Sequence, residues 1–153
     1  MSADITCGRA GGALISMQHC ENCYYKRIPD DVSQIFCTYR IHTQIKEARD
    51  AAIEKSKAAL HDMTLKRDGY YTRGRPRLAE KMEKQIKSQK EKHAELLKIN
   101  EALNALAGRA IKAAEDHPKK RAEIIKKEEQ LRAACKTKAA AEKLLQKENL
   151  FEL

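Results

Sequence analysis

An apolar repeat between residues 96 and 113 limits what this chain can fold into. Its members are separated by alternating steps of three and four residues, the spacing of coiled-coil core positions: Leu96, Ile99, Leu103, Leu106, Ala110 and Ala113. Such a stripe lies on one face of an α-helix and needs a second helix to cover it. Of the 153 residues, 35% are charged and 5% are aromatic. This composition is typical of long helices rather than of a compact globule.

Breaks in the pattern divide the chain into three expected helices. The first is predicted over 31–66, where Asp31 resembles an N-cap. A basic connector over 67–77 follows, and the second helix is expected over 76–115. After the Asp-His-Pro break at 116–118, a third helix is expected over 118–149.

Short connectors favour antiparallel neighbours. We therefore predict a mainly α fold, built as a long antiparallel helical hairpin or three-helix coiled-coil rod with a small zinc-finger-like N-terminal head. The alternative is that Pro118 only kinks one continuous helix. A second chain would then cover the apolar stripe, and the protein would be a homodimer through its helices.

Four of the first 42 residues have the spacing of metal ligands. Cys20, Cys23, Cys37 and His42 form the pattern Cys-x2-Cys-x13-Cys-x4-His. Zinc takes four such ligands in a tetrahedron. The spacing resembles that of Cys2His2-type zinc fingers, in a Cys-Cys-Cys-His variant. We expect a structural zinc ion in a head over 19–42 that runs into the first helix.

The fourth ligand is open to a competing interpretation. Ligands five residues apart on an ideal helix point about 140° from each other, so the helix would have to start late or bend for Cys37 and His42 to share one ion. Cys7 is the alternative fourth ligand, although it belongs to a glycine-rich stretch over 1–18 that we expect to be a flexible arm. In both interpretations all four positions are protein ligands, so the metal is predicted to be structural rather than catalytic.

The chain contains neither an apolar run of about 20 residues, the length of a membrane span, nor the pattern of a signal peptide. We therefore expect a cytoplasmic or nuclear protein without a membrane partner. In a reducing compartment the five cysteines would not normally form disulfides, which favours metal binding for the clustered ones.

The formal net charge is +9, and the excess is concentrated at 67–77 and along 118–147. Localised positive charge favours a nucleic acid, an anionic surface or an acidic protein. Residues 73–77, Arg-Gly-Arg-Pro-Arg, resemble the core of an AT-hook, whose arginines lie in a narrow A·T minor groove. The candidate nucleic-acid contacts are Tyr70, Tyr71, Arg73, Arg75, Arg77, Lys119, Lys120 and Arg121. The alternative is a solvated connector in which Pro76 only starts a helix.

No nucleophile–base set or phosphate-binding glycine loop is recognisable, so we expect no enzymatic activity. The first functional hypothesis is a nucleic-acid-associated regulator that combines a structural zinc site with a basic helical rod. The second is a protein-interaction factor, an inhibitor or adaptor, that docks its hairpin or its head on a larger enzyme. A metal head plus a coiled-coil finger is similar to the general architecture of polymerase secondary-channel regulators, but their acidic finger tip is absent here.

Overall fold

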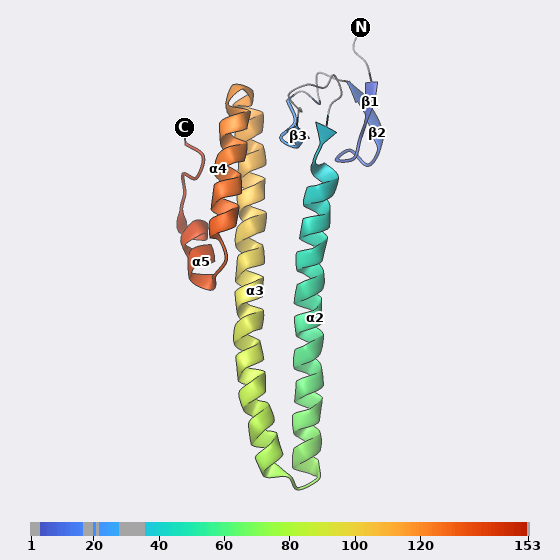
Figure 1. Cartoon of the computed structure of the whole chain (residues 1–153), viewed down its shortest axis with the longest axis vertical. Coiled ribbons are helices and arrows are strands. Elements are labelled where there is room, and N and C mark those ends of the chain that lie inside the picture. The colour runs from blue at the N-terminus through green and yellow to red at the C-terminus, as the bar shows by residue number, and fades with distance from the viewer. Residues whose placement is uncertain (1–3, 17–19, 21, 28–35, 153) are drawn as a thin grey trace.

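Two long antiparallel helices form most of the molecule (Figure 1). The computed structural model describes residues 4–16, 20, 22–27 and 36–152. Its helices are α2 (Tyr39–Thr72), α3 (Pro76–Asp116), the short 3-10 helix η1 (Pro118–Lys120), α4 (Arg121–Ala134) and α5 (Lys138–Gln146). The prediction of a mainly α chain with a long antiparallel hairpin is confirmed. The 41 residues of α3 give it a length of about 60 Å.

A three-residue turn joins α2 to α3. Gly74 has φ +70°, the left-handed conformation that closes many helices. Its N–H donates to the Tyr71 carbonyl (3.1 Å), and the Arg75 N–H donates to the Tyr70 carbonyl (2.8 Å). This pair of bonds is a Schellman motif. Pro76 then occupies the first position of α3, where its missing N–H costs nothing.

The expected connector over 67–77 was therefore too long. Residues 67–72 continue α2, and only 73–75 lie between the helices. Gly69, which falls within the expected connector, stays inside the helix. A glycine in a helix interior costs only about 1 kcal/mol relative to alanine, whereas the left-handed turn at Gly74 specifically favours glycine.

Residues 31–35 lie outside the described ranges, so the structure tests the helix expected from residue 31 only from residue 36 onward. Residues 36–38 are not helical, and the prediction is wrong there. Strand β4 (Phe36–Cys37) pairs antiparallel with β3 (Lys26–Arg27), and α2 begins only at Tyr39. Thr38 fixes the junction, because its N–H (2.9 Å) and its hydroxyl (2.8 Å) both donate to the Tyr25 carbonyl.

The stretch predicted as an irregular arm is a β-hairpin over its described residues. Strand β1 (Asp4–Cys7) pairs antiparallel with β2 (Ala13–Ser16). Gly11 and Gly12, with φ +68° and +85°, make the turn, and the Gly12 N–H donates to the Cys7 carbonyl (2.8 Å). The prediction of a flexible arm over 1–18 is thus corrected for 4–16.

Pro118 marks a reversal of the chain, since α4 runs back along the upper part of α3 (Figure 1). The single helix expected over 118–149 is interrupted between α4 and α5. The Thr137 side chain accepts the Ala140 N–H (3.2 Å) and caps a new helix. This break turns α5 so that Ala141 and Leu144 are buried against α3.

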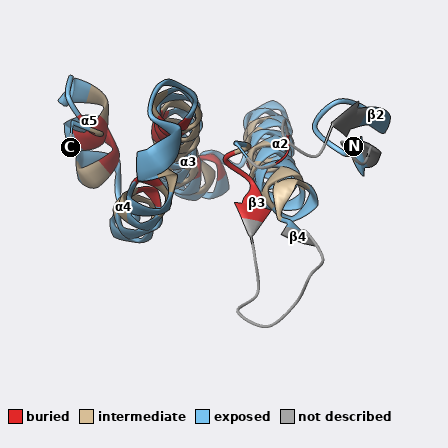
Figure 2. Cartoon of the chain, turned by 90° about the horizontal axis from the view of Figure 1, so that it is seen from above, coloured by how far each residue is buried: buried red, intermediate tan, exposed pale blue. Residues whose placement is uncertain are grey.

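The core lies at one end of the rod. Buried side chains gather where α3 meets α4, α5 and the N-terminal head, whereas α2 is mostly exposed (Figure 2). Leu106 and Ile124 are the largest fully buried side chains. Among its described residues α2 buries only Ser56. No helix in the described part of the chain combines the length and apolar character needed to cross a membrane.

Candidate functional site

The turn between α2 and α3, together with the helix ends that flank it, forms the tip of the rod (residues 70–77). Arg73 and Arg75 lie in the turn, and Arg77 lies in the first turn of α3; all three are exposed. Tyr71 is 47% exposed and donates its hydroxyl proton to the Glu83 carboxylate (2.8 Å), a bond that raises the pKa of Tyr71. Tyr70 is half-buried.

The backbone of the tip differs from that of the AT-hook which its sequence resembles. Gly74 adopts the left-handed conformation, and Arg77 is helical. The Gly-Arg-Pro run thus ends one helix and starts the next, which accounts for its glycine and its proline. It does not account for the three arginines, whose charges project at the far end of the rod.

The other predicted basic cluster lies at the opposite end of α3. Lys119 and Lys120 are exposed on η1. Arg121 is partly buried and donates to the Cys23 carbonyl (3.1 Å), so it holds the head against α4. About 60 Å of helix separates this cluster from the tip, and the two therefore do not form one continuous surface.

Three of the predicted metal ligands lie on one small β unit. The Cys23 N–H donates to the Cys20 carbonyl (3.0 Å), and the Lys26 N–H donates to the Cys23 carbonyl (3.2 Å), so the Cys-x2-Cys segment makes a tight turn. Cys37 pairs directly with Lys26 across the β3–β4 ladder. Because β3 follows this turn within three residues of Cys23, the pairing brings Cys37 to the same unit.

Cys7 reaches this unit from the β1–β2 hairpin. Its neighbour Arg9 has Nη1 at 3.9 Å from the Cys23 sulfur and Nη2 at 3.1 Å from Glu115 on α3. The guanidinium also lies over the Tyr25 ring, 5.8 Å from its centroid. Burial lowers the pKa of Arg9, but the hydrogen bonds to Glu115 and Cys23 outweigh it and raise the pKa.

The thiols interact electrostatically around Cys20, which is 7% exposed. Burial is the largest cause that raises the pKa of Cys20, and the Cys23, Cys37 and Cys7 thiols raise it further, with Lys26 opposing them. All five cysteines are free thiols. Within the described ranges, however, no group of three or more Cys, His, Asp or Glu side chains is arranged so that it could hold a metal ion.

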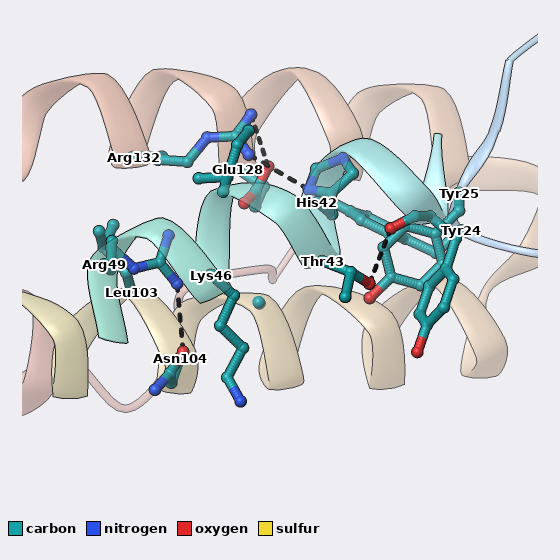
Figure 3. Close-up of a pocket in the computed structure, with 13 residues that line it drawn as sticks. Tyr24, Tyr25, His42, Thr43, Lys46, Arg49, Leu103, Asn104, Glu128 and Arg132 are labelled. Carbon is teal, nitrogen blue, oxygen red and sulfur yellow. Dashed lines mark hydrogen bonds and ion pairs between the residues drawn. The ribbon is translucent and has the colours of Figure 1, made fainter. Parts of the chain in front are cut away.

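His42 belongs to a different environment. Its ring lies 5.2 Å from the Tyr25 ring, centroid to centroid. Arg132 on α4 places Nη1 3.4 Å from the His42 Nδ1; since a guanidinium can only donate, Nδ1 is the acceptor. The imidazole thus points toward α4, as Figure 3 shows.

His42 lines a cavity of about 280 Å³ where the head, α2, α3 and α4 meet (Figure 3). None of the five cysteines lines it. Glu128, 3% exposed, forms an ion pair with Arg132 (3.6 Å) at this junction. Arg49 bonds to Asn104 (3.2 Å) and so links α2 to α3. Hydrophobic periodicity could not predict this junction, because its polar groups come from four separate segments.

Comparison of the chain with protein-family models, with curated proteins and with solved structures finds no significant match. The functional argument therefore rests on the residues of this chain.

Proposed function

We propose that this protein binds nucleic acid without catalysing a reaction, and that it does so through the tip of the α2–α3 hairpin. The observation that carries the proposal is the clustering of Arg73, Arg75 and Arg77 at an exposed turn. The remainder of the molecule would position this tip, and the protein would act as a regulator of a nucleic-acid process.

Phosphate contact is the chemistry that fits the tip. Arginine presents several N–H donors in a planar fork that matches phosphate oxygens. Arg73 and Arg75 lie outside the helices, in one short loop. Tyr71 adds an exposed ring beside them, and aromatic rings of this kind stack on unpaired bases. These features favour backbone contact and stacking rather than base-specific hydrogen bonding.

Fluorescence anisotropy of labelled single-stranded DNA, duplex DNA and RNA at several salt concentrations tests the proposal. Each phosphate contact on duplex DNA contributes about −0.9 to the slope of log K against log salt. Replacing Arg73, Arg75 and Arg77 by Gln should therefore weaken binding and reduce the slope by up to about 2.7.

A matched variant separates the tip from general positive charge. Lys126, Lys143 and Lys147 are exposed, lie away from the tip and are not among the predicted nucleic-acid contacts. Replacing these three by Gln removes the same formal charge and should leave most of the affinity in place. Equal losses in the two variants would show that only net charge matters, and the proposal would then fail.

A second candidate function has its own supporting observation. Large apolar side chains are exposed along the rod, among them Ile45 (43%), Leu65 (57%) and Leu97 (46%). Exposed apolar surface favours protein contact, either with a larger enzyme or with a second copy of this chain. Affinity purification with wild type and with an I45Q/L65Q variant tests it. A stoichiometric protein complex that the variant loses and the tip variant keeps would favour this candidate.

A further inference from the structure

We propose that the cavity between the head, α2, α3 and α4 (Figure 3) binds a phosphate group, either as inorganic phosphate or as a small phosphate ester. About 36 Å of helix separates its Arg49 from Arg73 at the tip. The proposal therefore concerns a second site and does not rest on nucleic-acid binding by the tip.

Positive charge exceeds negative charge on the wall of this cavity. Lys46, Arg49 and Arg132 line it together with a single carboxylate, that of Glu128. His42 adds no charge, because its Nδ1 accepts a hydrogen bond from Arg132. Three cations against one carboxylate leave a net charge of +2 on the wall. An anion is the ligand that fits, since charges withdrawn from water need a partner.

Arg49 is oriented by neutral groups. Its Nε donates to the side-chain oxygen of Asn100 (3.1 Å), and its Nη2 donates to that of Asn104 (3.2 Å). Both acceptors are amides on α3, so they fix the guanidinium and leave its charge uncompensated. Its Nη1 donates to none of the described residues and remains available to a ligand. A guanidinium that is fixed in advance loses less entropy when it binds phosphate oxygens.

Arg132 brings a second guanidinium to the cavity from α4. Its Nη1 lies 3.4 Å from the His42 Nδ1, and its Nη2 lies 3.6 Å from the Glu128 carboxylate. The two arginines repel each other: burial lowers the pKa of Arg49, and the charge of Arg132 lowers it further, with Asp50 opposing both. An anion bound in the cavity would reduce this repulsion.

Phosphate fits the wall better than a carboxylate does. A phosphate monoester carries a charge of about −1.5 to −2 at neutral pH, close to the opposite of the wall's charge. Its oxygens accept paired N–H groups from a guanidinium. The cavity of about 280 Å³ lies just below the usual range of ligand pockets, about 300–1,000 Å³. The ligand is therefore small.

The wall also offers a hydrogen-bond acceptor. Glu128 is 3% exposed, and its Oε2 accepts no hydrogen bond from the described residues. A hydroxyl group of the ligand could donate to this oxygen while its phosphate contacts the arginines. The side chains of Tyr24, Tyr25 and Tyr39 line the same cavity and supply apolar surface for a short carbon chain. These features favour a phosphate ester that carries hydroxyl groups.

The ligand would fasten α2 to the core. Among its described residues α2 buries only Ser56, whereas Arg132 lies on α4, which packs on α3. A phosphate held by Arg49 and Arg132 would therefore join the start of α2 to α4. Because the folded chain alone has this site, the thermal midpoint should rise with ligand concentration.

Titration of the full-length chain, followed by amide NMR, tests the site. The probes are glycerol phosphate, inorganic phosphate and uncharged glycerol. We expect saturable shifts over 42–49 and 103–107 with both phosphates and none with glycerol. Tighter binding of glycerol phosphate would identify an ester as the ligand, and equal affinities would identify inorganic phosphate. Absence of saturable shifts, or shifts confined to the tip at 70–77, overturns the proposal.

A pair of lysine variants separates the cavity from general charge without disturbing the core. Lys46 and Lys57 are both exposed on α2, but only Lys46 lines the cavity. K46Q should weaken phosphate binding by about two- to fivefold, and K57Q should leave it unchanged. Equal losses in the two variants overturn the proposal.

Arg49 supplies the larger effect. R49Q should weaken phosphate binding roughly 10- to 100-fold, the loss expected for a charged hydrogen-bond partner. R49K should restore only part of the affinity, because lysine keeps the charge and lacks the planar fork. The triple variant of the tip should bind phosphate like the wild type, so failure of either proposal leaves the other standing.

Discussion

Replacing Ser56 by Ala should loosen the middle of the hairpin. Ser56 is the buried residue of α2, 6% exposed, and its hydroxyl meets two side chains of α3. Gln89 donates Nε2–H to the Ser56 oxygen at 3.0 Å, and the His93 Nδ1 lies 3.0 Å from the same oxygen. The substitution removes both hydrogen bonds and leaves their partners at a partly buried interface.

The expected magnitude follows from these two bonds and from helix propensity. Each bond contributes about 1 kcal/mol net, so the loss is about 2 kcal/mol. Alanine is the better helix former by about 0.5 kcal/mol, which leaves a net destabilisation of about 1.5 kcal/mol. S88A is the matched control, because Ser88 is an exposed serine inside α3. It should stabilise its helix by about 0.5 kcal/mol.

Hydrogen exchange of the amides around residue 56 measures this local stability. A change of 1.5 kcal/mol corresponds to roughly tenfold faster exchange in S56A, whereas S88A should slow exchange nearby. If S56A exchanged as slowly as S88A, the hydroxyl would contribute nothing to helix pairing. The reasoning about a polar layer that holds the hairpin together would then be refuted.

Two further predictions concern glycines and a buried thiol. G74A should destabilise the chain by about 1 kcal/mol or more, because φ +70° is strained for alanine. G108A should stabilise it by about 1 kcal/mol, because Gly108 lies in a helix interior with open space for a Cβ. Thermal unfolding of both variants measures the two effects. Cys135 is 5% exposed, and burial raises its pKa, so iodoacetamide should alkylate it far more slowly at neutral pH than the exposed Cys37 in metal-free protein. Peptide mass spectrometry over time measures the two rates, and equal rates would contradict this.

The helical rod could be predicted because its signals are periodic and local. The apolar repeat identified α3 in advance, and Pro76 marked its first residue correctly. The connector was expected to begin at residue 67, before Gly69, although Gly74 is the glycine that closes the helix. Gly74 adopts the left-handed backbone conformation and Gly69 does not. The two glycines lie five residues apart, and the sequence around them does not show which one will adopt it. Thr137 was overlooked as a cap because the residues on both sides favour a helix.

The head and the candidate site depended on contacts that are distant in sequence. Phe36 and Cys37 belong to a strand because β3 is available to pair with them, and no helical pattern encodes that partner. Ligand spacing favoured His42, but spacing alone could not show that Arg132 and Tyr25 surround its ring. The basic residues at the tip and at η1 were grouped by composition, and only the fold shows that a long helix separates them.

The central claim is that the tip contacts nucleic acid, and site-specific photocrosslinking tests it most directly. Benzoylphenylalanine would replace Tyr71 at the tip or Leu97 in the upper half of α3, two positions of nearly equal exposure (47% and 46%). After irradiation with labelled single-stranded nucleic acid, we expect a crosslink from position 71 and little from position 97. A crosslink from position 97 without one from position 71 would contradict the claim.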